Sequence, residues 1–379
     1  MKIRNLIIFG TRPEAIKMAP LVKMFHEHND TFDTKVCITA QHREMLDQVL
    51  EFFKIQPDFD MNLMRPGQNL FSLTGDIISG LKEILEVFKP EYVFVHGDTT
   101  TTMAASIAAF YYGAKVCHIE AGLRTFDKGA PFPEEMNRSI VGRIAEFHFA
   151  PTISAKNNLL KENVPEDQIL VTGNTVIDAL EMSVTKLRSS HFKDDEIEKL
   201  KSLIKPNKKI VLVTGHRREN HGQGFIDICN ALVDLGRENE NIQIVYPVHL
   251  NPNVQKPVYE ILRNFDNIYL IPPLSYPSFV WLMDRSHLII TDSGGVQEEA
   301  PSLGKPVLVM RETTERPEAV EAGTVILTGT DRFKIFKEAH LLLNDENSYN
   351  EMSLRHNPYG DGQACSRIVK FMKAQTKQK

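Results

Sequence analysis

The sequence predicts an α/β protein of two domains, each built on a parallel sheet with helices on both faces. Short apolar runs without polar alternation recur along the chain, which is typical of strands buried on both faces of a sheet. Segments with helical periodicity separate these runs, as in βαβ units. The same alternation restarts after a polar, lysine-rich stretch at 189–209. With 379 residues, the chain is longer than one core usually supports.

The first domain is predicted at residues 1–170. Two segments have the apolar periodicity of long helices, 70–88 and 100–113. The predicted strands are "NLIIFG", "KVCITA", "YVFVHG", "KVCHIE" and "FHFAP".

The second domain is predicted at residues 175–355. The final segment, about 362–379, is expected to be helical and could pack back on the first domain. The predicted strands of the second domain are "KKIVLVTGHR", "IQIVYPVHL", "NIYLIPP", "HLIITDSGG", "KPVLVM" and "GTVILTG".

Composition and charge exclude several classes of protein. The chain is 42% hydrophobic and 25% charged, as in ordinary folded proteins. A net charge of -5 argues against a nucleic-acid partner, which would normally require a basic surface. No apolar run reaches the length of a membrane span, and the N-terminus lacks the apolar core of a signal peptide. We therefore expect a cytoplasmic protein without a membrane partner.

Cysteine usage indicates neither a disulfide framework nor a zinc site. The four cysteines, at 37, 117, 229 and 365, are far apart and never form CxxC. Cys37 and Cys117 lie in apolar, strand-like runs, where a cysteine is usually a small buried hydrophobe. We expect a reducing compartment and no bound metal.

Polar side chains follow the first and third predicted strands, where a parallel sheet presents ligand sites. Arg12 and Lys17 lie near the start of a helix that Pro13 or Pro20 could initiate, so they could contact phosphate or be exposed cations. Asp98 precedes four threonines and could be a helix cap or an acid/base group. Neither GxGxxG nor GxxxxGK[ST] occurs, so no dinucleotide or P-loop site is expected.

The segment "LIITDSGGVQEEA" is the clearest predicted phosphate site. A strand ends at Asp292, and Ser293, Gly294 and Gly295 allow close approach of a diphosphate to backbone N–H groups at a helix start. Glu299 lies about one turn into that helix, where it could accept hydrogen bonds from ribose hydroxyls. The alternative is a plain glycine turn.

Two further segments of the second half carry cations. His216, Arg217 and Arg218 follow its first predicted strand. A histidine with two arginines at a strand end favours an anion site over a structural role. Arg316 lies beside a turn at Pro317.

Residues 118–138, "HIEAGLRTFDKGAPFPEEMNR", concentrate four carboxylates: Glu120, Asp127, Glu134 and Glu135. These could be solvated loop charges or catalytic groups. Glu134 and Arg138 are four residues apart and would share a helix face. They could form a surface ion pair of little energetic value, or Arg138 could hold Glu134 in position.

These motifs resemble those of the non-hydrolysing UDP-N-acetylglucosamine 2-epimerases of bacteria. The resemblance runs from about residue 3 to "NPYGDGQACSR" and includes "FGTRPEAIKMAPL", "HGDTTTT", "PFPEEMNR", "TGHRREN" and "TDSGGVQEEAPSLGKPVLVMR". It implies a glycosyltransferase-B-like fold of two Rossmann-like domains with the active site in the cleft between them. It also implies conversion of UDP-GlcNAc to UDP-ManNAc, typically by a homodimer, as a precursor for surface polysaccharide. We expect no cofactor, because the sequence lacks the usual dinucleotide signature.

The resemblance assigns roles to individual residues. Close relatives often have a polar residue near the uracil where this sequence has Leu274, so a side-chain contact there is in doubt. The implied catalytic residues are Asp98, Glu120, Glu134 and His216. The implied substrate contacts are Arg12, Lys17, Arg138, Phe279, Ser293, Gly294, Gly295, Glu299 and Arg316. Some members have a second, regulatory UDP-GlcNAc site, whose pattern Gln41, Gln68, Arg217 and His249 match.

Inversion at C2 requires removal of a hydrogen that no adjacent carbonyl acidifies. Loss of the anomeric UDP makes this hydrogen removable and leaves a 2-acetamidoglucal, and re-addition with protonation on the opposite face completes the inversion. Proton carriers are then needed on both faces of C2. We expect Asp98 and Glu134 to transfer protons and Glu120 to orient the sugar or share the proton. Asp127 and Glu135 are expected to be solvated.

Three alternatives remain open. They are a UDP-GlcNAc-dependent glycosyltransferase of the same fold, a hydrolysing epimerase that releases ManNAc, and a UDP-sugar-binding regulator without turnover. The regulator is disfavoured because three carboxylates in its site would repel an anionic ligand.

Overall fold

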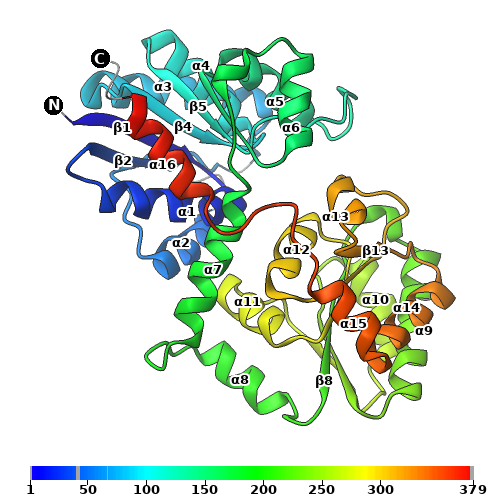
Figure 1. The fold of residues 1–379 in the computed structure, drawn as a ribbon. Helices are drawn as coiled ribbons and strands as arrows, with labels where there is room; N and C mark the ends of the chain where they lie inside the picture. The colour runs from blue at the N-terminus through cyan, green and yellow to red at the C-terminus, as the bar shows by residue number, and fades with distance from the viewer. Residues whose placement is uncertain (1, 40–42, 66, 376–379) are drawn as a thin grey trace. The chain divides into compact units, whose positions relative to one another are not determined.

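The structure, a computed structural model, describes residues 2–39, 43–65 and 67–375. The chain forms two compact units, Met1–Glu181 with Tyr359–Lys379, and Met182–Pro358. Helix α7 (Thr175–Arg188) carries the chain from the first unit into the second (Figure 1). The predicted boundary at 170–175 lies at the start of this helix, whereas the change of unit lies within it.

The first unit contains a seven-stranded parallel sheet in the order β3-β2-β1-β4-β5-β6-β7. All five predicted strands are present. Two were not predicted, β3 and β7, which are short and lie at the edges of the sheet. The strands are β1 (Ile3–Phe9), β2 (Phe32–Ile38), β3 (Phe59–Asp60), β4 (Tyr92–His96), β5 (Lys115–Ile119), β6 (Phe147–Ala150) and β7 (Ile169–Val171).

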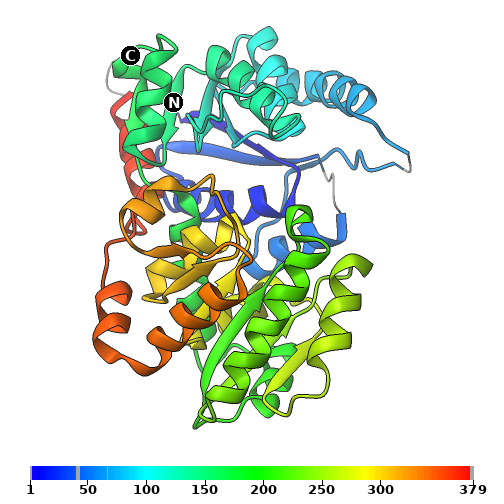
Figure 2. The same ribbon diagram turned by 90° about the vertical axis from the view of Figure 1, so that its right-hand side faces the viewer.

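Helices cover both faces of this sheet. Val93 and Val95 of β4 pack in the same cluster as residues of α3 and α4. Phe94, between them, faces the other way and contacts Phe25 of α1, with ring centroids 5.1 Å apart. Figure 2 shows α1 on one side of the strands and the cyan helices on the other. The helices are α1 (Arg12–Glu27), α2 (Arg43–Phe53), α3 (Leu70–Phe88), α4 (Thr100–Tyr112), α5 (Glu134–Ile144) and α6 (Ile153–Lys161).

The last helix, α16 (Ala364–Gln375), belongs to the first unit. It lies beside α1, as Figure 1 shows in red and blue. Phe371 packs edge-on against Phe147 and Phe149 of β6, with centroids 5.0 and 5.6 Å away. Burial of these rings holds the end of the chain on the first sheet.

The second unit contains a six-stranded parallel sheet in the order β10-β9-β8-β11-β12-β13. All six of its predicted strands are present, because each is a continuous apolar run. They are β8 (Lys209–Thr214), β9 (Ile242–Pro247), β10 (Ile268–Ile271), β11 (Leu288–Thr291), β12 (Val307–Val309) and β13 (Val325–Leu327). The covering helices are α8 (Asp195–Leu203), α9 (Gln223–Glu238), α10 (Pro252–Leu262), α11 (Tyr276–Arg285), α12 (Gly294–Glu299), α13 (Pro317–Glu321), α14 (Arg332–Asn344) and α15 (Glu346–Ser353).

Two parallel sheets with covering helices confirm the predicted fold class. All four cysteines are buried and free. None of the helices within the described ranges has the length and hydropathy that a membrane span requires.

Candidate functional site

The carboxylates of the first unit follow strands that end at the same edge of its sheet. His96, the last residue of β4, pairs with Ile119, the last residue of β5. Glu120 comes directly after β5, and Asp98 follows the end of β4 by two residues. Ligands of parallel sheets bind beyond this edge, because loops and helix N-termini converge there.

Glu120 is a buried, ionised carboxylate. Its side chain is 9% exposed, and its backbone has φ of 60°, a conformation that costs a non-glycine residue free energy and is typical of functional sites. Its Oε2 accepts hydrogen bonds from Lys17 Nζ and from Asn174 Nδ2, the latter at 2.9 Å, and lies 3.5 Å from His96 Nε2. Burial alone would raise the pKa of Glu120, but the Lys17 ammonium and His96 hold it well below the usual range.

The pKa of Asp98 is shifted in the opposite direction from that of Glu120. Thr99, rather than Asp98, caps α4, because its Oγ1 accepts the Thr102 N–H at 3.1 Å. The Asp98 carboxylate instead accepts a 2.5 Å hydrogen bond from Arg138 Nη2. Burial raises the pKa of Asp98 above its ordinary value; Arg138 opposes this, while repulsion by Glu120 and by Glu134 adds to it. Two neighbouring carboxylates whose pKa values are pushed apart are typical of acid/base sites.

The prediction that Glu135 is a solvated charge is wrong. Its side chain is 3% exposed and accepts the N–H groups of Thr125 at 3.0 Å and Phe126 at 2.9 Å. It also lies 3.3 Å from Arg138 Nη1, one helical turn away. Glu135 therefore ties the preceding loop to α5, while Asp127 on that loop is exposed, as predicted.

Glu134 is the first residue of α5, and its Oε2 is buried without a hydrogen-bond partner in the described residues. Arg138 pairs with Asp98 and Glu135 rather than with Glu134, so the expected contact between Glu134 and Arg138 is wrong. A carboxylate at a helix N-terminus is favoured by the helix dipole.

The first turn of α1 supplies cations to the same edge. Thr11 caps the helix in a capping box with Glu14, and Pro13 lies in its first turn, whereas Pro20 lies inside it. Arg12 is half-buried, and no hydrogen bond or ion pair joins its guanidinium to another residue in the described part of the chain. Lys17, one turn later, contacts Glu120.

In the second unit, His216 pairs with an aspartate that the sequence analysis did not assign. The Asp292 side chain is fully buried, and its Oδ1 lies 3.3 Å from His216 Nδ1. Its Oδ2 accepts the backbone N–H groups of His216 and Arg217, both at 2.8 Å. Burial would raise the pKa of Asp292, but these donors lower it. The carboxylate therefore faces Nδ1 of His216, whose side chain is 44% exposed.

The predicted phosphate turn lies between β11 and α12, and Ser293 occupies the N-cap position. Arg316 approaches this turn, since a methyl group on Gly294 would lie 3.9 Å from Arg316 Nη2. The Arg316 guanidinium is held by an ion pair with buried Glu298. The structure therefore brings a fixed cation to the free N–H groups of a helix start, an arrangement suited to phosphate.

Two more predicted contacts belong to the second unit. Glu299 ends α12 and is 9% exposed. Burial raises the pKa of Tyr276, and the charge of Glu299 raises it further, so the two side chains are neighbours. Phe279 lies one turn along α11 from Tyr276 and is half-buried, as is Leu274 just before that helix.

The residues that match the regulatory pattern have different surroundings. Gln41 lies outside the described residues. Gln68 Nε2 donates to the Leu63 carbonyl oxygen at 2.9 Å. Arg217 Nε is buried without a partner in the described residues. His249 stacks on His216, with ring centroids 5.4 Å apart.

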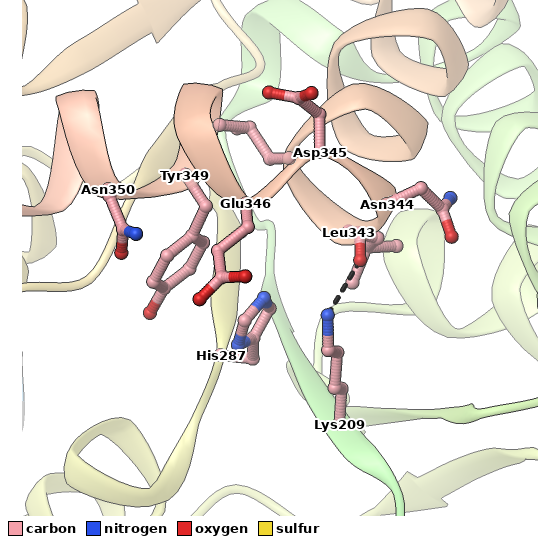
Figure 3. Close-up of a pocket in the computed structure, with 9 residues that line it drawn as sticks. Lys209, His287, Leu343, Asn344, Asp345, Glu346, Tyr349 and Asn350 are labelled. Atoms are coloured by element: carbon pink, nitrogen blue, oxygen red, sulfur yellow. Dashed lines mark hydrogen bonds between the residues drawn. The ribbon is translucent and has the colours of Figure 1, made fainter.

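A separate cavity of about 420 Å³ lies at the opposite edge of the second sheet (Figure 3). Lys209 begins β8 and His287 precedes β11, so the cavity lies at the amino ends of these strands. His287 stacks on Tyr349 at 4.1 Å, and Lys209 Nζ donates to the Leu343 carbonyl. None of the predicted site residues lines this cavity. Its lining is Lys209, His287, Leu342, Leu343, Asn344, Asp345, Glu346, Tyr349 and Asn350.

Within the described ranges, no group of three or more His, Cys, Asp and Glu side chains is arranged to hold a metal ion.

Comparison with known proteins agrees with this geometry. Residues 24–373 match the family profile described as UDP-N-acetylglucosamine 2-epimerase. The chain is 58% identical over 372 residues to the UDP-N-acetylglucosamine 2-epimerase of Salmonella typhimurium, covering 98% of this chain and 99% of that protein. It is 59% identical over 371 residues to that of Escherichia coli K12, covering 98% of both.

Solved structures are similar over the same length. The Neisseria meningitidis UDP-GlcNAc 2-epimerase bound to UDP-GlcNAc matches with a TM-score of 0.89 and 52% identity, covering 98% of this chain and all of that one. The Methanocaldococcus jannaschii enzyme, in complex with UDP-GlcNAc and UDP, matches with a TM-score of 0.78 and 32% identity, again covering 98% and 100%. The chain belongs to the UDP-N-acetylglucosamine 2-epimerase family.

Proposed function

We propose that this protein interconverts UDP-N-acetylglucosamine and UDP-N-acetylmannosamine by elimination and re-addition of UDP. The observation that carries the mechanism is the pair of carboxylates after β4 and β5 whose pKa values are shifted in opposite directions. Relatives at 58% and 59% identity bear the name of this epimerase. The match to an enzyme bound to UDP-GlcNAc supports the same substrate.

The residues of the second unit take the UDP. The diphosphate accepts hydrogen bonds from the N–H groups after Ser293 and pairs with the Arg316 guanidinium, whose position Glu298 fixes. His216, with its Nδ1 held by Asp292, presents Nε2 to the diphosphate. Glu299 accepts from the ribose hydroxyls. Together these donors stabilise the negative charge that develops when the C1–O bond breaks.

The residues of the first unit act on the sugar. Asp98 has a raised pKa, so it can hold a proton closer to neutral pH and exchange it with C2. Glu134 has an unpartnered oxygen and serves the opposite face. Glu120 stays ionised because Lys17 donates to its Oε2 and the His96 ring lies 3.5 Å from it, so it orients the sugar and stabilises positive charge at C1. This division keeps Asp98 and Glu134 as the proton carriers.

Proton NMR of UDP-GlcNAc incubated with the pure protein in deuterated water tests the function. The expected result is UDP-ManNAc in equilibrium with substrate, with deuterium at C2 of both sugars. Free ManNAc and UDP would indicate a hydrolysing epimerase. Transfer that requires an acceptor would indicate a glycosyltransferase, and an unchanged spectrum would indicate a binding protein. Asp98→Asn should abolish turnover while UDP binding survives.

We also propose that the protein is a cytoplasmic homodimer. Helices α3 and α4, packed against each other, expose apolar side chains on the first unit. Phe71 is 90% exposed, Val87 70%, Phe110 63% and Tyr111 76%. A second subunit would bury these surfaces. Light scattering should give twice the 43.1 kDa chain mass, and Phe110→Glu with Tyr111→Glu should shift it to the monomer mass.

The residues that match the regulatory pattern support a second UDP-GlcNAc site. Sigmoidal dependence of the reverse reaction on UDP-GlcNAc is then expected, and Gln68→Ala should make it hyperbolic. Hyperbolic kinetics in the unsubstituted protein would count against this site.

A further inference from the structure

Asn174 lies where the carboxylate of Glu120 meets the start of α7, and neither the motifs nor the proposed mechanism assigns it a role. Its side chain is 3% exposed. Its Nδ2 donates to Glu120 Oε2 at 2.9 Å, and its Oδ1 accepts the Val176 N–H at 3.0 Å. Its backbone N–H donates to the Tyr359 carbonyl at 2.7 Å. Three separate hydrogen bonds therefore fix one buried residue.

These contacts determine the orientation of the amide. The Val176 N–H can only donate, so it requires the amide oxygen of Asn174, and the amide nitrogen must then face the carboxylate. Reversal of the amide would place its oxygen against the Glu120 carboxylate and its nitrogen against an N–H group. The side chain is thus a rigid donor aimed at one oxygen of Glu120.

Lys17 donates to the same oxygen but is a different kind of partner. Its side chain is flexible, and its position matches a substrate contact, so its hydrogen bonds can change when substrate binds. Asn174 is held by backbone groups at the start of α7 and at Tyr359, the first residue of the returning segment. The hydrogen bonds that Lys17 and Asn174 donate to Glu120 both go to Oε2, and Oε1 accepts none from the described residues.

We propose that Asn174 is a positioning residue for the epimerase reaction, which fixes Glu120 through Oε2 and leaves Oε1 for the substrate. This inference rests on the proposed function. Asn174 acts through Glu120 and does not touch the substrate. Its loss should therefore reduce kcat rather than raise KM.

Two substitutions separate this role from helix capping. Asn174→Asp and Asn174→Ser both keep an oxygen for the Val176 N–H, but neither offers the amide donor. In Asn174→Asp a second carboxylate faces Glu120, so the pKa of Glu120 should rise by about one to three units. We expect kcat to fall by about 10- to 100-fold, with KM near the unsubstituted value. Asn174→Ser should show the same changes to a smaller extent.

Asn69→Asp is the matched control. Asn69 also caps a helix, α3, by accepting the Ser72 N–H at 2.9 Å, but it is exposed, and its side chain donates to no carboxylate in the described part of the chain. Thermal unfolding establishes that each variant is folded, and Asn174→Ser replaces Asn174→Asp if the latter is not. The control should retain the kinetics and pH profile of the unsubstituted protein.

A titration without substrate distinguishes this inference from the proposed function. The carboxyl carbon of Glu120, labelled with carbon-13 and assigned with Glu120→Gln, should titrate at higher pH in Asn174→Asp than in the Asn69→Asp control. This result supports the positioning role even if the protein makes no UDP-ManNAc. An unchanged Glu120 titration and an unchanged kcat in a folded Asn174 variant would overturn it.

Discussion

Arg138→Met removes the cation that holds Asp98 while keeping most of the side-chain volume. Arg138 Nη2 lies 2.5 Å from Asp98 Oδ2, and the two side chains are 10% and 28% exposed. Loss of this positive charge leaves Asp98 near Glu120 and Glu134, both of which already raise its pKa. The pKa of Asp98 should therefore rise further.

The magnitude follows from the separation of the charges. Two unit charges about 4 Å apart attract by about 4 kcal/mol at an effective dielectric constant of about 20. Because Asp98 is partly exposed, solvent screening reduces this to about 2 kcal/mol. Since one pKa unit corresponds to about 1.4 kcal/mol, the pKa of Asp98 should rise by about 1.5 units. If ionised Asp98 is the base, the acidic limb of kcat/KM moves up by the same amount.

The assay is the pH dependence of UDP-ManNAc formation, with thermal unfolding as a check on folding. Glu135 loses its counter-ion in this variant, so stability should fall by about 1–3 kcal/mol, and the added substitution Glu135→Gln should recover part of it. Arg143→Met, on the exposed face of α5, is the matched control and should leave the limb in place. A folded Arg138→Met variant with an unmoved limb would refute the role given to Asp98.

Three other predictions concern binding and stability. Gly294→Ala should fold normally, because its methyl group would lie 3.9 Å from Arg316. Calorimetry should nevertheless show UDP binding weakened about tenfold, because the methyl group obstructs the N–H groups of the turn. Unchanged affinity would show that this turn does not bind the diphosphate. Glu14→Ala should lower the free energy of unfolding in urea by about 2–4 kcal/mol, because Glu14 is 2% exposed and accepts hydrogen bonds from two backbone N–H groups. A smaller loss would mean that water takes the place of the carboxylate as the acceptor of these two bonds. Burial lowers the pKa of His118 to about 3 and that of His148 to about 4, so below pH 6.5 only the unfolded chain binds these protons. Stability should then fall by up to about 1.4 kcal/mol per pH unit for each histidine, and an equal urea midpoint at pH 7 and pH 5 would contradict their burial.

Most of the fold could be predicted because its strands are long enough to be seen as apolar runs. The six strands of the second sheet follow this pattern, and α3 has the predicted bounds 70–88. Strand β3 has two residues, too few for a period to be visible. Strand β7 has three residues, as do the predicted strands β12 and β13, so its apolar run offered the same signal. The change of unit falls within α7, where helical periodicity continues without a break in composition.

The positions of the candidate site residues could be predicted, but their pairings could not. A strand end followed by a polar residue indicates the loop, yet only three-dimensional packing shows that Arg138 contacts Asp98 rather than Glu134. The prediction that Glu135 is solvated is wrong because a charge-rich segment is usually exposed to solvent, whereas this side chain is buried. Its spacing of three from Arg138 is compatible with a pair on one helix face. Asp292 follows a strand as Asp98 does, so the sequence carries the same signal of a site residue at both positions.

The central claim is that the bond between C1 of the sugar and the β-phosphate oxygen breaks during the reaction. UDP-GlcNAc labelled with oxygen-18 in this bridging position tests it directly, with phosphorus-31 NMR as the readout. Elimination frees the β-phosphate to rotate before re-addition, so the label should move into the non-bridging positions of recovered UDP-GlcNAc and of UDP-ManNAc. Epimerisation at C2 with the label retained entirely in the bridge would contradict the elimination account.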